Sequence, residues 1–223
     1  MEHPAPDSKD WTWVLERPCP ECHFDVASID RNRLGALFRA NAAAWRAILS
    51  RGSIVTRRPP SPDGTVVWSA LEYGAHVRDV YQLFHDRVRD MLTKDGPTFR
   101  NWNQDRAAIE GRYQEEDPGR VAYRLAVTSG EVADIVDRIH GDQWNRTGAR
   151  SDGSTFTVAS LLDYLLHDVT HHVHDAEAGF EAIAEADAEL ADDLDSDGVD
   201  GDGTEGDEPP GDSMNGDELD GDE

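Results

Sequence analysis

Residues 158–187 read "VASLLDYLLHDVTHHVHDAEAGFEAIAEAD", and their apolar side chains recur every three or four positions. This period is typical of an amphipathic helix that turns one face towards a core. Thr157, directly before the stretch, is a good N-cap residue. The most apolar side of the expected helix is formed by Leu162, Leu165, Val169 and Val173.

Two earlier segments show the same period. Residues 29–50 form the first expected helix, with Asp30 available as its N-cap. Ser69 and Glu72 lie three residues apart, as in a capping box, and the apolar pattern after them predicts a second helix that runs to about Thr93. Prolines and an Asp-Gly pair in the "RRPPSPDGT" between the two helices break regular structure.

A third helix is expected to open with Pro118 in its first turn and to end at Gly141. A long connection, "TFRNWNQDRAAIEGRYQEEDPGR", separates it from the second helix, and its aromatic residues indicate that it packs on the domain. Only the short "TVVW" near Thr65 has the character of a strand. The sequence therefore predicts an all-α protein, a four-helix bundle with a long crossover connection between helices 2 and 3.

The net charge of −25 is unevenly distributed. Residues 181–223 hold 19 acidic and no basic residues, which leaves 27 acidic and 21 basic residues before them. Rich in Asp and Gly and poor in apolar side chains, this acidic tail is expected to be disordered, and its charge repels nucleic acid and anionic membranes. We expect a tail that keeps the protein soluble, with a partner contact as the alternative. The chain thus divides into an N-terminal segment (1–28), a bundle (29–180) and a disordered acidic tail (181–223).

No stretch approaches the about 18 consecutive apolar residues of a membrane span, and no basic region precedes an apolar core near the first residue. We therefore expect a cytoplasmic protein. Its two cysteines, Cys19 and Cys22, form no disulfide framework. With His23 they supply half of a possible zinc knuckle, for which His3 is the only close further histidine. A redox pair, or two reduced thiols that anchor the N-terminal segment, are the alternatives.

Four of the nine histidines lie in the stretch "HDVTHHVHD". Residues four apart share a helix face, so His167 and His171 point the same way. At about 100° per residue, His174 lies about 20° to one side of His167 and His171 about 40° to the other, whereas His172 points away. This stripe is either part of a metal site or the solvated face of an amphipathic helix.

His76, on the second helix, is a third candidate ligand. It lies among apolar neighbours, where a histidine needs partners for its ring nitrogens, and a core histidine with one hydrogen bond is the alternative. At about 1.5 Å per residue, His76 lies about 10 Å along its helix, and His167 and His171 about 15 and 21 Å along theirs. If the second and fourth helices run parallel, as alternation in a bundle implies, the three rings lie at similar levels.

Three imidazoles can bind zinc, nickel or iron through one nitrogen each and leave a position open for water or a substrate thiolate. This is the chemistry of an active site, because the cation lowers the pKa of what it binds. Candidates for holding a ring N–H of these ligands are Asp163, Asp168 and Asp175.

The sequence resembles the DinB/YfiT-like family of metal-binding four-helix bundles, which includes mycothiol-dependent maleylpyruvate isomerases and other thiol transferases. The resemblance rests on "WSALEYGAHVRDV" and "FTVASLLDYLLHDVTHH" and covers roughly residues 30–178. It implies that His76, His167 and His171 bind one divalent metal, with zinc preferred over nickel or iron.

The same resemblance implies a low-molecular-weight thiol whose metal-bound thiolate attacks a small electrophilic substrate, and it makes a homodimer the default. The connection after the second helix is similar to an actinobacterial branch of the family, which implies that Trp102, Asn103 and Asp105 approach the metal. Candidates for binding a carboxylated cosubstrate are Arg106, Arg146 and Arg150.

Two other functions stay open. A non-catalytic, metal- or ligand-binding stress-response module would have the same composition. An HD-type phosphohydrolase would use a His-Asp pair, which occurs at His85-Asp86 and at His167-Asp168, although the spacing of the outlying ligands fits poorly. The "HDVTH" stretch also mimics the zincin motif, but Asp168 is shorter than the glutamate base of those enzymes.

Overall fold

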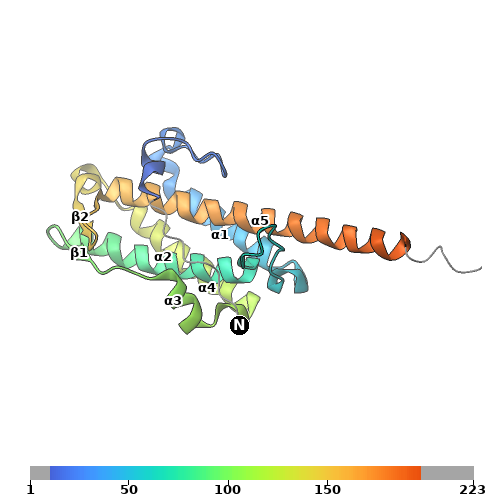
Figure 1. Ribbon diagram of the computed structural model, residues 1–223. Coiled ribbons are helices and arrows are strands. Elements are labelled where there is room, and N and C mark those ends of the chain that lie inside the picture. The colour runs from blue at the N-terminus through green and yellow to red at the C-terminus, as the bar shows by residue number, and fades with distance from the viewer. Residues whose placement is uncertain (1–10, 197–223) are drawn as a thin grey trace, which may run out of the picture. The chain divides into compact units, whose positions relative to one another are not determined.

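The structure, a computed structural model, describes residues 11–196 (Figure 1). Four long helices form the predicted bundle, and a short helix lies in the connection between the second and third of them. The helices are α1 (Leu34–Leu49), α2 (Ala70–Thr93), α3 (Gln104–Gly111), α4 (Pro118–Val136) and α5 (Val158–Ser196). Single 3-10 turns are Thr12–Leu15, Val26–Ser28, Arg31–Arg33, Gly52–Thr56, Tyr113–Glu115 and Gly141–Asn145. None of the described helices is long and apolar enough to cross a membrane.

The helix starts follow the local signals in the sequence. The capping box at Ser69 and Glu72 is present, and Pro118 occupies the first turn of α4. The first helix differs, because the Asp30 side chain accepts a hydrogen bond from Asn32 N–H and caps a 3-10 turn, so that α1 begins only at Leu34.

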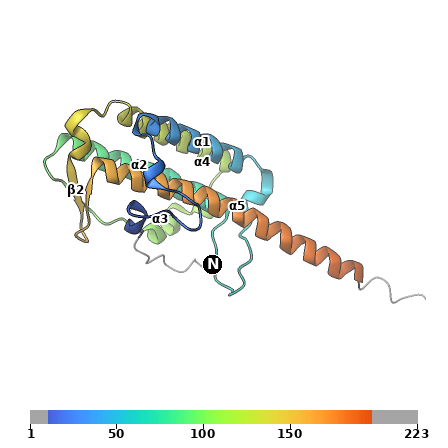
Figure 2. The same ribbon diagram turned by 90° about the horizontal axis from the view of Figure 1, so that it is seen from above.

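The direction of the last helix differs from the expectation. Phe84 on α2 packs on Tyr164 of α5, and His76, earlier on α2, packs on His172, later on α5. The two helices are therefore antiparallel, as Figures 1 and 2 also show. The cause is the long connection after α2, which runs back along the bundle, makes α4 parallel to α2 and leaves α5 to run against both.

The strands also lie elsewhere than expected. Residues 65–68 form none, whereas β1 (Thr98–Phe99), β2 (Thr147–Arg150) and β3 (Thr155–Thr157) make a small sheet in the order β1-β2-β3. β1 pairs parallel to β2, and β2 and β3 form an antiparallel hairpin. These strands are too short to show a period of two in the sequence. They close the end of the bundle where α2 ends and α5 begins (Figure 2).

Part of the segment that the sequence predicts to be a disordered tail is helical. The helix α5 continues to Ser196, through residues 181–196 that the composition assigned to disorder. Alanine, glutamate and leucine dominate the start of this segment and are strong helix formers, which outweighs the shortage of apolar side chains. The rest of the predicted tail, 197–223, lies outside the described residues, as do His3 and the start of the N-terminal segment.

Large buried side chains from all four long helices form one core, among them Phe38, Trp45, Tyr81, Leu125 and Leu165. Two side chains tie α5 to α1 and to the 3-10 turn before it. Asn41 Nδ2 donates to the Val169 carbonyl at 2.8 Å, and Arg31 pairs with the buried Asp163 at 2.7 Å. These contacts fix the rotation of α5, and thereby the faces on which its histidines lie.

Candidate metal centres

Two groups of metal-ligating side chains lie along α5 in the described part of the chain. The first, called the pocket cluster below, consists of His76, Asp168 and His172. The second, called the cysteine cluster, consists of Cys19, Cys22, His167 and His171. Within each group, one ligand atom per residue lies within 4.8 Å of all the others.

The three predicted ligands, His76, His167 and His171, all line one cavity, but they belong to different groups of ligating side chains. His167 and His171 lie together, with ring centroids 5.2 Å apart, and share their cluster with two cysteines. His76 instead faces His172, at 4.8 Å between ring centroids. The set of three histidines around one cation therefore stays a prediction, and the geometry favours a different division.

The helix contains two overlapping pairs with the same spacing. Asp168 and His172 are four residues apart, as are His167 and His171, and the two pairs are turned by about 100° from one another. Sequence reasoning treated Asp168 as a neighbour of a ligand and His172 as pointing away. The spacing was visible, but only the position of α2 shows which pair His76 meets.

His76 is a buried histidine without a hydrogen-bond partner. Its side chain is 1% exposed, lies against the rings of Trp68 and Trp102, and neither ring nitrogen finds a partner among residues 11–196. Burial, with a smaller contribution from His172, holds the pKa of His76 well below its usual value. The neutral ring therefore carries a lone pair that a cation would satisfy, since an orphaned buried nitrogen is costly.

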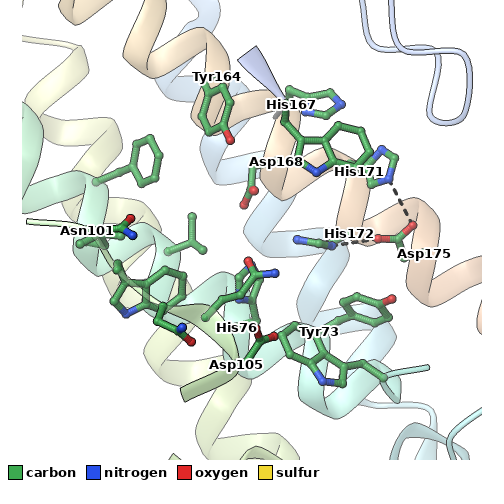
Figure 3. A pocket seen from close by; sticks show the side chains of 18 of the residues that line it. Tyr73, His76, Asn101, Asp105, Tyr164, His167, Asp168, His171, His172 and Asp175 are labelled. Carbon is green, nitrogen blue, oxygen red and sulfur yellow. Dashed lines mark hydrogen bonds and ion pairs between the residues drawn. The ribbon is translucent and has the colours of Figure 1, made fainter. Parts of the chain in front are cut away.

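A carboxylate orients His172. Its Nδ1 lies 2.9 Å from Asp175 Oδ2, and its ring stacks on Tyr73 with centroids 5.2 Å apart. A carboxylate at Nδ1 favours the tautomer in which Nε2 has the lone pair, the arrangement common in metal-bound histidines. Figure 3 shows His172 between Asp175 and His76, with Asp168 beside it.

The pocket cluster opens into a cavity of about 540 Å³. All three of its residues line this cavity, together with Trp102, Asn103 and Asp105, as the family resemblance implied. A cavity of this size suits a small-molecule ligand. Of the three arginines considered for a cosubstrate, only Arg150 lines it. Arg106 pairs with Glu110, and Arg146 donates to the backbone carbonyls of Met91 and Lys94.

A second arginine, Arg87, lines the cavity and was missed in the sequence. It is 9% exposed, packs over the rings of Phe84 and Phe99, and its Nε has no acceptor within the described residues. Burial, then the charge of Arg150, lowers the pKa of Arg87 to about 10, so the guanidinium stays charged at neutral pH. Both arginines line the cavity, Arg150 while paired with Asp152 at 2.6 Å, and their charges favour an anionic ligand.

The cysteine cluster joins the N-terminal segment to α5. Cys19 is 1% exposed, and its Sγ lies 3.6 Å from His171 Nδ1. On the other side of the same ring, His171 Nε2 lies 3.3 Å from Glu21 Oε2 and 3.5 Å from Asp175 Oδ1. His167 is 3% exposed, and no group in residues 11–196 pairs with its Nε2.

These side chains favour a metal site over a redox pair. Burial raises the pKa of Cys22 to about 11, so the thiol stays protonated at neutral pH and is a poor nucleophile. Burial, then His171, lowers the pKa of His167 to about 4, and burial also lowers the pKa of His171. Both rings are therefore neutral, the form that binds a metal.

The structure does not assemble the HD-type site within the described residues. His85 Nδ1 contacts Asp86 Oδ1 at 3.2 Å, and neither residue belongs to a cluster of metal-ligating groups there. The other His-Asp pair, His167-Asp168, does not act on one cation, because His167 lies in the cysteine cluster and Asp168 in the pocket cluster.

A family model described as the DinB superfamily matches residues 54–176, which include the pocket cluster and leave out Cys19 and Cys22. Among solved structures, the chain is similar to YfiT from Bacillus subtilis, described as "a probable metal-dependent hydrolase with an unusual four-helix bundle topology". The sequences are 18% identical, with a TM-score of 0.58, over 67% of this chain and 87% of that one. This likeness bears on the fold alone. No curated protein matches the sequence.

Proposed function

The chain belongs to the DinB superfamily, and from this premise we propose that it is a metal-dependent enzyme whose divalent cation is held by His76, Asp168 and His172. The observation that carries the proposal is the buried, neutral His76, whose orphaned ring nitrogens lie beside a carboxylate and a second imidazole. Two imidazoles and one carboxylate suit zinc, and also iron.

Three protein ligands leave a coordination position for a small nucleophile, as in catalytic rather than structural sites. A cation bound there supplies Lewis acidity and lowers the pKa of a coordinated thiol or water. Of the chain's own groups, Arg87 and Arg150 bind the anionic part of a ligand, and Asp175 holds the His172 ring in place. Trp102 and Phe84 add apolar surface to the lining of the cavity.

The reaction we propose is transfer of a low-molecular-weight thiol to a small electrophile, or a thiol-dependent isomerisation. A thiol or an electrophile that carries a carboxylate would find two arginines, Arg87 and Arg150, in the cavity. Hydrolysis is the second candidate, because the similar YfiT structure is described as a probable metal-dependent hydrolase. For transfer, the full chain loaded with zinc or iron should consume a carboxylated thiol in the presence of an activated alkene, whereas isomerisation would need the thiol but release it unchanged. Ester hydrolysis without thiol consumption would instead favour the second candidate.

Arg87→Met is expected to raise KM for the carboxylated thiol by about 10- to 100-fold with a smaller change in kcat, because a charged hydrogen bond contributes about 1.5–3 kcal/mol. Steady-state kinetics with the thiol varied would measure the effect. Arg106→Met is the matched control, since Arg106 is an exposed arginine outside the cavity that pairs with Glu110. Equal KM values for the two variants would show that Arg87 does not bind the thiol.

A further inference from the structure

We propose that Cys19, Cys22, His167 and His171 bind a second cation of the zinc class, which clamps the N-terminal segment onto α5. This inference goes beyond the proposed function and does not depend on it. The spacing is that of a Cys2His2 site, with two residues between the cysteines and three between the histidines. The cysteines come from the N-terminal segment and the histidines from α5, with 152 positions between Cys19 and His171.

The distance between the Cys19 sulfur and the nearest ring nitrogen of His171 fits tetrahedral zinc. Bonds of about 2.3 Å to sulfur and about 2.0–2.1 Å to nitrogen, at a tetrahedral angle, place the two ligand atoms about 3.6 Å apart. Cys19 Sγ and His171 Nδ1 are 3.6 Å apart. A sulfur and a ring nitrogen therefore already have the separation that a shared zinc ion requires.

The surroundings of His171 are those of a metal ligand. Its Nδ1 faces the Cys19 sulfur, while its Nε2 faces the carboxylates of Glu21 and Asp175. A carboxylate on the far nitrogen orients a zinc-bound imidazole and increases its basicity. Asp175 also contacts His172 of the pocket cluster, so one carboxylate supports a ligand in each cluster.

His167 supplies the second, independent sign of a missing ligand. Its side chain is almost fully buried, against the rings of Trp11 and Phe24, yet its Nε2 has no partner within residues 11–196. A buried polar group of this kind needs a partner. A cation shared with the neighbouring cysteines would give the buried Nε2 of His167 a partner and so remove the free-energy cost of leaving it unpaired.

The backbone brings the two cysteines to one side of a tight loop. Cys19 N–H donates to the Phe24 carbonyl at 2.8 Å, and His23 N–H donates to the Cys19 carbonyl at 3.0 Å. His23 adopts a left-handed backbone with φ of 58°, which is uncommon outside glycine and turns the chain back at this point.

Four protein ligands fill the coordination sphere, so this site is structural rather than catalytic. Zinc binding converts both thiols to thiolates and releases their two protons to solvent. The cation would fix a segment that buries Val14 and Cys19 and brings Trp11 to the wall of the pocket. Metal in the cysteine cluster would thereby shape one side of the substrate cavity.

Titration of the reduced, metal-free full chain with Co²⁺ tests this site directly, because thiolate ligands give an intense sulfur-to-cobalt charge-transfer absorption. We expect one bound equivalent that produces this absorption, and metal at the pocket cluster of the proposed function would add a second equivalent without it. The double variant Cys19→Ser, Cys22→Ser should bind one equivalent fewer than the wild type and lack the absorption. Asp168→Ala, the matched control, should bind one equivalent and keep the absorption. Absence of the absorption in the wild type, or as many equivalents in the double variant as in the wild type, would overturn the proposal.

A second measurement needs no variant. The rate at which iodoacetamide alkylates the two thiols of the wild type should rise at least about tenfold when a chelator removes zinc. Equal rates with and without zinc would contradict the site. A mass lower by two hydrogen atoms under reducing purification would do the same, because it would show a disulfide. Neither the cobalt absorption nor the alkylation rate depends on thiol transfer. Failure of the cysteine cluster can therefore be distinguished from failure of the proposed function.

Discussion

Asp168→Ala is expected to lower metal-dependent turnover by about 10³-fold, because it removes the anionic ligand of the pocket cluster and with it several kcal/mol of transition-state stabilisation. The residue is half-buried at the cavity wall rather than in the core, so the bundle should stay folded. Measurements of kcat/KM with saturating zinc, together with the thermal midpoint, would separate the loss of activity from unfolding.

Asp187→Ala is the matched control for that variant. It removes a carboxylate from the same helix, but one that is 51% exposed and pairs with Arg57 away from the pocket. Its turnover should equal that of the wild type. If Asp168→Ala retained both its metal and its turnover, the pocket cluster would not be the catalytic centre.

Glu72→Ala is expected to lower the free energy of unfolding by about 3 kcal/mol, since removal of one partner from a buried ion pair costs about 3–5 kcal/mol. The Glu72 side chain is 5% exposed, and its carboxylate accepts hydrogen bonds from Arg58 at 2.6 and 2.9 Å and from Ser69 N–H at 2.9 Å. These bonds fix the start of α2, one turn before His76. Urea unfolding of the metal-free chain would measure the loss.

The same carboxylate gives a pH dependence with a defined sign. Burial alone would raise the pKa of Glu72, but the hydrogen bonds from Arg58 and Ser69 outweigh it and hold the pKa below 4.5. A pKa that is lowered on folding stabilises the protein above pH 4.5, and this stability is lost as the pH falls through the folded pKa. Unfolding free energies should therefore converge for Glu72→Ala and the wild type in acid.

Glu177→Ala provides the comparison at the surface. Glu177 forms a bidentate pair with Arg51 of similar length, but both side chains are more than 40% exposed. Exposed pairs contribute about 0–1 kcal/mol, so this variant should differ little from the wild type at any pH. If both variants lost the same free energy of unfolding, burial would not make the Glu72–Arg58 pair more stabilising than the exposed pair.

Local signals in the sequence were enough to predict the bundle. The capping box at Ser69 and Glu72, Pro118 in a first turn and the apolar period of α5 predicted helices where the structure has them. Such signals act within a few residues, so they do not determine how whole helices are directed. The length of the connection after α2 predicts a crossover, but local signals do not report that α5 then runs antiparallel to α2.

The direction of α5 determines which of its side chains lie beside His76. With α5 antiparallel to α2, His76 meets Asp168 and His172, and the face that carries His167 and His171 lies against the N-terminal segment. The sequence offers the cysteines as half of a possible zinc knuckle, but the histidines that lie beside them are more than a hundred residues further along the chain. Contacts at that separation depend on tertiary packing, which neither periodicity nor local spacing reports.

We infer that α5 supplies ligands to two separate cations, from two pairs of residues offset by one position. Anomalous X-ray diffraction at the zinc edge, from crystals of the full chain grown with zinc, tests it most directly. We predict two peaks, one among Cys19, Cys22, His167 and His171 and one among His76, Asp168 and His172. A single peak shared by His76, His167 and His171 would contradict this account.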